Sequence, residues 1–294
     1  IDSYFRQDDM LALVSAYSDY KAKYLFNFRF DTTLFQTAVA HRKLGFFDEA
    51  LDILRFLETR SGGTVGELVQ LEKAQALLEK GDLTEARNTV AKFLQHYPNS
   101  SYDAEARQLL ARIYRQQKSY PRALLVYQQT LQKYDQNKQP LLAEIVPELY
   151  YDLAELQEET GNFVEAGEAF QDAISSYNHP LDHQDTPEYI IKSHFLTADM
   201  HNKALNDETA LKSYQQAISL YADKTNKEII ERVFWARYQI GAIYTRQDED
   251  QLALKVFKQL MDEKTGEGQL WKKLATENHR AISRKLAYDA YLKE

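Results

Sequence analysis

A short pattern recurs six times along this chain of 294 residues, and it constrains the fold more than any other feature. Each copy has a short polar or glycine-containing turn, then an alanine, then an aromatic or aliphatic residue four positions later. Successive alanines are 36, 37, 43, 44 and 43 residues apart; they are Ala50, Ala86, Ala123, Ala166, Ala210 and Ala253. Six matches at a nearly constant period indicate a structural repeat.

The copy in residues 99–134 shows what one repeat contains. Its first half has an apolar stripe at helical spacing that ends near Tyr114, and its second half has another that includes Tyr127 and Leu131. Pro121 stands where the first turn of the second helix is expected, and its missing N–H costs nothing there. We predict two helices joined by a tight turn. One such hairpin cannot bury its apolar face alone, so it needs neighbouring copies.

Each repeated alanine is expected to face a small residue of the preceding helix, because small side chains allow two helices to cross closely. These small residues are Ala38, Ala74, Ala111, Ala154, Ala198 and Gly241. The larger residues four positions after the alanines are Leu54, Val90, Tyr127, Phe170, Tyr214 and Phe257. We expect all three sets to pack between the paired helices.

This pattern resembles the tetratricopeptide repeat family. The shared marks are the small residue of the first helix, the turns at Gly81 and Gly161, the alanine and aromatic pair of the second helix, and Pro98 at a repeat end. The resemblance covers about residues 30–261, but the later repeats exceed the family period of about 34 residues, and the signature tryptophan is absent from most copies. It implies an all-α, right-handed superhelical solenoid of about six helix-turn-helix repeats.

The two ends of the chain differ from the repeats. We expect a partial N-terminal hairpin in residues 1–29, the repeat array in residues 30–265, and a C-terminal capping region in residues 266–294. Leu11, Ala12 and Ala16 are expected on one apolar stripe of the first part. The last part is expected to close the array with a polar outer face. Because the chain begins with isoleucine, we expect a processed product or a part of a longer chain.

Composition excludes several classes of function. With 36 Lys and Arg against 44 Asp and Glu, the formal charge is −8, which disfavours nucleic acid as the partner and leaves room for a cationic one. The absence of cysteine excludes disulfides and thiolate metal sites. No run of about 18 apolar residues occurs, so we expect no membrane-spanning helix.

Signatures of enzymes are missing: the chain has no phosphate-binding loop, no dinucleotide fingerprint and no nucleophile elbow. We therefore expect neither catalysis nor a cofactor. Four side chains in one connector could bind a transition metal, although a solvated polar loop is the favoured interpretation; they are His179, Asp182, His183 and Asp185. His194 and His201 are expected to pack between hairpins.

The first helices of stacked hairpins line the concave side of such an array, which is the usual site for a peptide or a partner helix. The repeat register predicts that this side carries Arg112, Arg115, Tyr151, Asp152, Glu155, Glu159, Phe195, Asp199, Asn202, Trp235 and Tyr238. Aromatic rings there would supply buried area, and carboxylates would set the register of a Lys- or Arg-bearing segment. The alternative is that the carboxylates are solvated and the rings fill gaps between repeats.

A non-catalytic scaffold or adaptor for protein partners is the favoured function. Two alternatives stay open: a regulatory or sensor module of a larger protein, and a solenoid that binds a glycan or small ligand. The Tyr-Pro-Asn-Ser sequence at residues 97–100 also resembles links in tetratricopeptide lipoproteins of the bacterial envelope, of the outer-membrane assembly and Tol-Pal coordinator types. It favours the periplasm or cell envelope over the cytoplasm. An open apolar face in residues 1–24 would allow self-association.

Overall fold

A computed structural model describes residues 9–12, 14–16, 30–60, 63–134, 142–177, 186–223 and 226–292 of the chain. These residues form helices, turns and short connections, and no strand occurs among them. The chain divides into two compact units, Ile1–Ile145 and Val146–Glu294. Within the described ranges, no helix combines the length and the apolar character needed to cross a bilayer.

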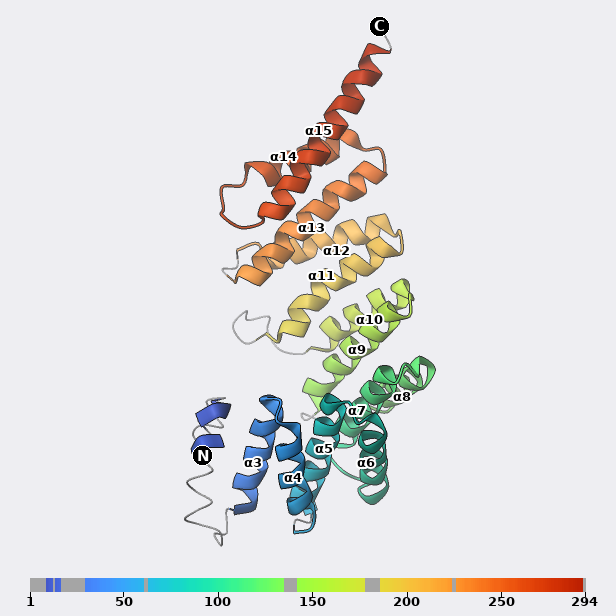
Figure 1. Ribbon diagram of the computed structural model, residues 1–294. Coiled ribbons are helices and arrows are strands. Elements are labelled where there is room, and N and C mark those ends of the chain that lie inside the picture. The colour runs from blue at the N-terminus through green and yellow to red at the C-terminus, as the bar shows by residue number, and fades with distance from the viewer. Residues whose placement is uncertain are drawn as a thin grey trace. The chain divides into compact units, whose positions relative to one another are not determined.

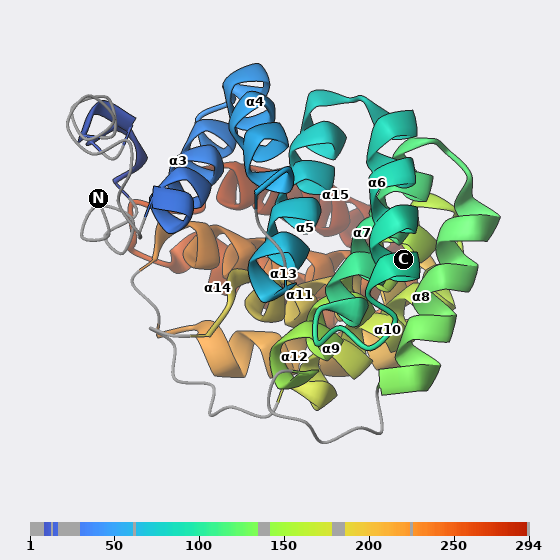
Figure 2. The ribbon, with the colours of Figure 1, turned by 90° about the horizontal axis from the view of Figure 1, so that it is seen from below.

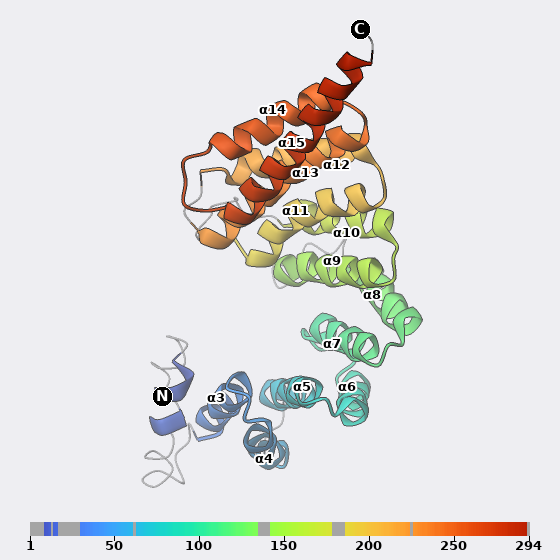
Figure 3. The ribbon, with the colours of Figure 1, turned by 45° about the horizontal axis from the view of Figure 1, so that its top comes forward.

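The first unit consists of helical hairpins. Its helices are α3 (Phe30–Lys43), α4 (Phe47–Glu58), α5 (Gly63–Lys80), α6 (Leu83–His96), α7 (Asp103–Gln116) and α8 (Tyr120–Tyr134). The first helices of the hairpins contact one another, α3 with α5 and α5 with α7. Figures 2 and 3 show α3, α5 and α7 along one side of this unit, and α4, α6 and α8 along the other.

The second unit continues the same arrangement. Its helices are α9 (Leu142–Glu159, which begins just before the unit), α10 (Phe163–Ser176), α11 (Glu188–Lys203), α12 (Asp207–Tyr221), α13 (Lys227–Arg246), α14 (Asp250–Asp262) and α15 (Gln269–Tyr291). Figure 1 shows α9 to α15 stacked in chain order. First helices again contact one another, α11 with α13 and α13 with α15. The predicted all-α solenoid of paired helices is confirmed.

Every hairpin turn contains one residue with a left-handed backbone, five positions before the repeated alanine. These residues are Gly45, Gly81 and Gly161, with φ of 82°, 95° and 82°, and Lys118, Leu205 and Asp248, with φ of 57°, 60° and 58°. In the second hairpin, the Asp82 N–H donates a hydrogen bond to the Leu77 carbonyl at 2.9 Å. The left-handed residue between the two helices thus reverses the chain, and the last carbonyls of the first helix still receive hydrogen bonds. Three turns use glycine for this conformation, and three impose it on residues with a side chain.

The predicted core lies between the paired helices. All six repeated alanines and all six larger residues four positions later have no exposed surface. The small residues of the first helices are buried as well. At Gly241, an added Cβ would lie 2.5 Å from the ring of Phe257, so the close approach of α13 and α14 requires glycine there.

The predicted stripe of the N-terminal hairpin is wrong at Leu11. Its side chain is 68% exposed, whereas Met10 is buried against Ala40 of α3 with Val14 beside it. The helical spacing of four residues between Met10 and Val14 brings these two side chains to the face that meets α3. Most of residues 1–29 lie outside the described residues.

At the other end of the chain, the single helix α15 covers the last hairpin. Ala275 and Ile282 are buried against the apolar cluster that contains Phe234 and Phe257. On the polar side of α15, Lys285 forms ion pairs with Asp248 of the preceding turn and with Asp250 at the start of α14, at 3.0 Å each.

The Tyr-Pro-Asn-Ser sequence forms the short link between α6 and α7. The Ser100 hydroxyl donates to the Glu67 carboxylate of α5 and accepts from the Tyr102 N–H at 3.0 Å. The link therefore has a structural role between two hairpins, and this role does not depend on the cell compartment in which the protein lies.

Candidate functional site

The predicted binding residues divide between the two units. Arg112 and Arg115 are half-buried on α7 in the first unit. The other nine lie in the second unit on α9, α11 and α13, which are the first helices of their hairpins. Each unit therefore presents its own share of the predicted surface.

Asp199 connects three helices, α11, α12 and α13, through hydrogen bonds. Its carboxylate accepts hydrogen bonds from the Tyr214 hydroxyl of α12 and from the Trp235 indole N–H of α13, the latter at 3.2 Å. Burial raises the pKa of Asp199, and both hydrogen bonds oppose that rise. The repeat register predicts that this carboxylate faces a partner, but in the folded chain it accepts hydrogen bonds from its own hairpin and from the next one.

Three half-buried aromatic side chains meet where α13 faces α15. The ring centroids of Trp235 and Trp271 lie 4.8 Å apart, and Tyr238 lies 5.8 Å from Trp271. The Tyr238 hydroxyl accepts a hydrogen bond from the Asn278 side chain at 2.9 Å. Trp271 was missing from the predicted site; it follows Trp235, the other of the two tryptophans in the chain, by 36 residues. The last repeats are 43 residues apart, so this separation does not place Trp271 in register with Trp235, and no sequence signal identified it.

Tyr151 occupies a comparable place on α9. Its ring meets Phe170 and Tyr189 edge-on, at centroid distances of 5.4 and 5.7 Å. Burial, followed by the charge and hydrogen bond of Glu155, raises the pKa of the Tyr151 hydroxyl. Glu155 is half-buried, and Glu159, one turn further along α9, is exposed.

Polar side chains link neighbouring first helices. Asn202 donates to the Gln239 side chain at 3.2 Å and accepts from Arg246 at 2.8 Å, which connects α11 with α13. Lys203 pairs with Glu158 at 2.6 Å and connects α11 with α9. The same face thus carries both inter-hairpin contacts and solvent-facing groups.

Two predicted binding residues lie in the interior instead. Phe195 is 1% exposed and packs against the ring of Tyr221 at 5.7 Å, and Asp152 is 5% exposed. The prediction that these side chains face a partner is wrong. The helix α11 packs against its own second helix, α12, and against α10 of the preceding hairpin, so its open face is narrower than the repeat register suggested.

His201 packs between hairpins, as predicted, whereas His194 is buried against the second helix of its own hairpin. His194 is 6% exposed beside Tyr221, and burial lowers its pKa to about 4. Burial also lowers the pKa of His201, whose ring lies against Gly167 of α10. The proposed metal-binding residues of the connector, positions 179–185, fall outside the described residues. Among the residues that the structure does describe, no group of His, Asp and Glu could hold a metal ion.

The residues that reach solvent on one face of the second unit form what we call the first-helix surface. They are Tyr151, Glu155, Glu159, Asn202, Trp235, Tyr238 and Trp271. This surface combines carboxylates with partly exposed rings. Its chemistry suits recognition of a segment that has both apolar and cationic groups.

Two parts of the chain match models of a known repeat family. Two sequence models described as tetratricopeptide repeat match residues 71–138 and 147–179. A search of curated proteins found no similar sequence.

Solved structures resemble almost the whole chain. The C-terminal part of a TPR repeat-containing protein from Cytophaga hutchinsonii matches with a TM-score of 0.65 and 13% identity, over 94% of this chain and 97% of that one. A tetratricopeptide repeat protein from Parabacteroides merdae gives 0.52 and 17%, over 96% and 95%. BtubC from P. vanneervenii gives 0.55 and 14%, over 84% and 92%. At such identities the likeness shows the fold alone, and none of these matches supports the resemblance to envelope lipoproteins.

Proposed function

We propose that this chain of tetratricopeptide repeats is a non-catalytic scaffold that binds a peptide or helix of a partner protein through the first-helix surface. The fold is typical of protein-interaction scaffolds. The observation that carries the proposal is the presence of Glu155 and Glu159 together with the rings of Tyr238 and Trp271 on first helices of one unit.

The partner segment is expected to be basic. The chain has a net charge of −8, and its first-helix surface presents carboxylates on α9. A Lys or Arg side chain gains attraction from those carboxylates, which raises the association rate, and from the face of a neighbouring aromatic ring. The proposal applies equally to a cytoplasmic chain and to an envelope chain.

Charge reversal at two residues of α9 that are not fully buried tests the proposal. In the double variant Glu155→Lys/Glu159→Lys, the first-helix surface loses two carboxylates and gains two cations. The matched control is Glu165→Lys/Glu168→Lys, which makes the same change on exposed residues of α10. Trp235 is left intact because it holds Asp199 in place.

Immobilised wild-type chain and both variants would be crosslinked in an extract of the source organism, and captured proteins identified by mass spectrometry. We expect a partner that the wild type and the control retain and that the α9 variant loses at least tenfold. Equal capture by all three proteins would contradict the proposal. Binding to a glycan column, with no protein captured, would favour the ligand-binding alternative.

A further inference from the structure

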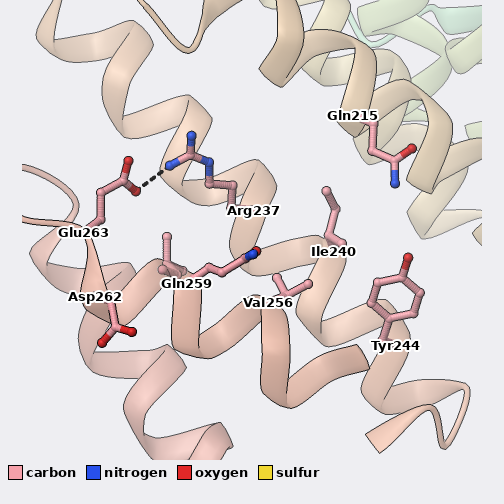
Figure 4. Close-up of a pocket in the computed structure, with 9 residues that line it drawn as sticks. Gln215, Arg237, Ile240, Tyr244, Val256, Gln259, Asp262 and Glu263 are labelled. Carbon is pink, nitrogen blue, oxygen red and sulfur yellow. Dashed lines mark hydrogen bonds and ion pairs between the residues drawn. The ribbon is translucent and has the colours of Figure 1, made fainter. Parts of the chain in front are cut away.

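A pocket of about 610 Å³ lies between α12, α13 and α14 in the second unit. Ile240, Val256 and Leu260 supply its apolar lining. Figure 4 shows Gln215 and Tyr244 at one end of the pocket and the paired side chains of Arg237 and Glu263 at the other. The volume falls in the range of ligand-binding clefts.

This pocket is separate from the first-helix surface. Arg237, Ile240 and Tyr244 are spaced by three and four residues along α13, so they share one side of that helix. Trp235 and Tyr238 are three residues apart and share the opposite side, because two helical positions differ by about 200°. A ligand in the pocket would therefore leave the first-helix surface open.

Three polar side chains at the pocket have no hydrogen-bond partner among the residues that the structure describes. They are those of Gln215, Gln259 and Tyr244. Two amides and one hydroxyl can each both donate and accept. Polar groups of this kind beside an apolar lining are the usual composition of a site that orients a ligand.

One carboxylate of the pocket has no counter-charge. Arg237 pairs with Glu263 at the rim, and Asp262 next to it forms no ion pair with any described residue. The charged lining residues therefore sum to a net −1. A cationic ligand group would complement this end of the pocket.

We propose that this pocket binds an extended peptide segment of another protein in which Lys or Arg lies within two residues of an aliphatic residue. The seven-residue step from Arg237 to Tyr244 spans about 10 Å of helix axis, which equals about three residues of extended chain. An extended backbone offers unpaired N–H and C=O groups to Gln215 and Gln259, whereas a helix has already paired its own. The aliphatic side chain covers the apolar lining, and the cation pairs with Asp262.

The test uses a phage-displayed library of random 12-residue peptides, selected on the immobilised chain of 294 residues. Enriched peptides would be synthesised with a fluorophore, and their dissociation constants measured by fluorescence polarisation. The variants are Asp262→Lys and Gln259→Ala, both at exposed positions. The matched control is Glu277→Lys, which makes the same charge reversal on exposed α15, outside the pocket.

We expect enriched peptides to contain the proposed pairing of cation and aliphatic residue. We expect D262K to weaken their binding at least tenfold and Q259A severalfold, with less than a twofold change in E277K and in the Glu155→Lys/Glu159→Lys variant. The inference is overturned if no peptide is enriched, or if the enriched peptides lack either group. It is also overturned if the α9 variant, rather than D262K, abolishes binding, a result that would instead support the proposed function.

Discussion

Asp199 and Trp235 illustrate how single side chains hold this array together. The Asp199 carboxylate satisfies a buried tyrosine hydroxyl and an indole N–H that come from two other helices. Removing it would leave both donors without a partner, which costs about 1–3 kcal/mol for each buried group. Residues of this kind are therefore poor choices for mapping a binding surface, because their loss changes the packing as well as the surface.

His194 predicts that stability falls with acidification. Its pKa is about 4 in the folded chain, against 6.5 for an ordinary histidine. Below pH 6.5, His194 is therefore protonated in the unfolded chain but remains neutral in the folded chain, and this difference persists down to pH 4. We expect a loss of about 2 kcal/mol between pH 7.5 and pH 5 from this residue alone, since one pKa unit corresponds to about 1.4 kcal/mol.

The measurement is the free energy of unfolding in urea at both pH values, for wild type and His194→Leu. Leucine fills a similar volume and cannot be protonated, so the variant should lose less stability on acidification than the wild type does. Comparing the two chains removes the contributions of buried acids such as Asp199, whose raised pKa acts in the opposite direction. Identical losses in the two proteins would show that His194 is not the titrating group.

Each of the six hairpin turns needs one residue in the left-handed conformation, but only three of the turns have glycine there. Leu205 adopts φ of 60°, and its side chain is 69% exposed, so it packs little while it holds a left-handed conformation. That conformation costs about 1–2 kcal/mol for a residue with a Cβ. Glycine at the equivalent positions Gly45, Gly81 and Gly161 avoids this cost.

We expect Leu205→Gly to stabilise the chain by about 0.5–1 kcal/mol, because the relief of strain exceeds the added flexibility of the unfolded chain. The midpoint of urea unfolding should rise. The comparison is Leu125→Gly, an exposed leucine in the middle of α8, which should destabilise by about 1 kcal/mol. A lower midpoint for Leu205→Gly would mean that the turn has no strain to release.

Over the whole molecule, the repeats allow one end to unfold without the rest. Both tryptophans of the chain, Trp235 and Trp271, lie at the contact of α13 with α15. Tryptophan fluorescence therefore reports on that end alone, whereas circular dichroism reports on every helix. The two signals are not required to change together in a linear array.

Ala275→Glu would place a charge where α15 packs with no exposed surface. Because an unpaired buried charge costs several kcal/mol, we expect α15 to detach. The fluorescence transition should then move to lower urea, while most of the helical signal persists. Ala287→Glu, at an exposed position of the same helix, is the control and should leave both transitions unchanged. A simultaneous shift of both signals in Ala275→Glu would show that the whole chain unfolds as one unit.

The sequence by itself determined the repeat, the hairpin and the core. Ala123 and Tyr127, or Ala210 and Tyr214, are set by spacing along one helix, and burial follows from that spacing. Such local periodicity depends only on the geometry of the helix, so it can be deduced without knowing the neighbouring hairpins.

Only the tertiary structure decided which side of each first helix remains open. Phe195 and Asp199 share the repeat register with Tyr238 and Glu155, which are half-buried and reach solvent. Phe195, however, is covered by Tyr221, and Asp199 accepts a hydrogen bond from Trp235 of the next hairpin. The pocket beside Ile240 likewise arises from three helices together. These features depend on how closely successive hairpins approach one another. That distance is set by how the side chains of the two hairpins fit together, and the spacing of residues along one hairpin does not determine it.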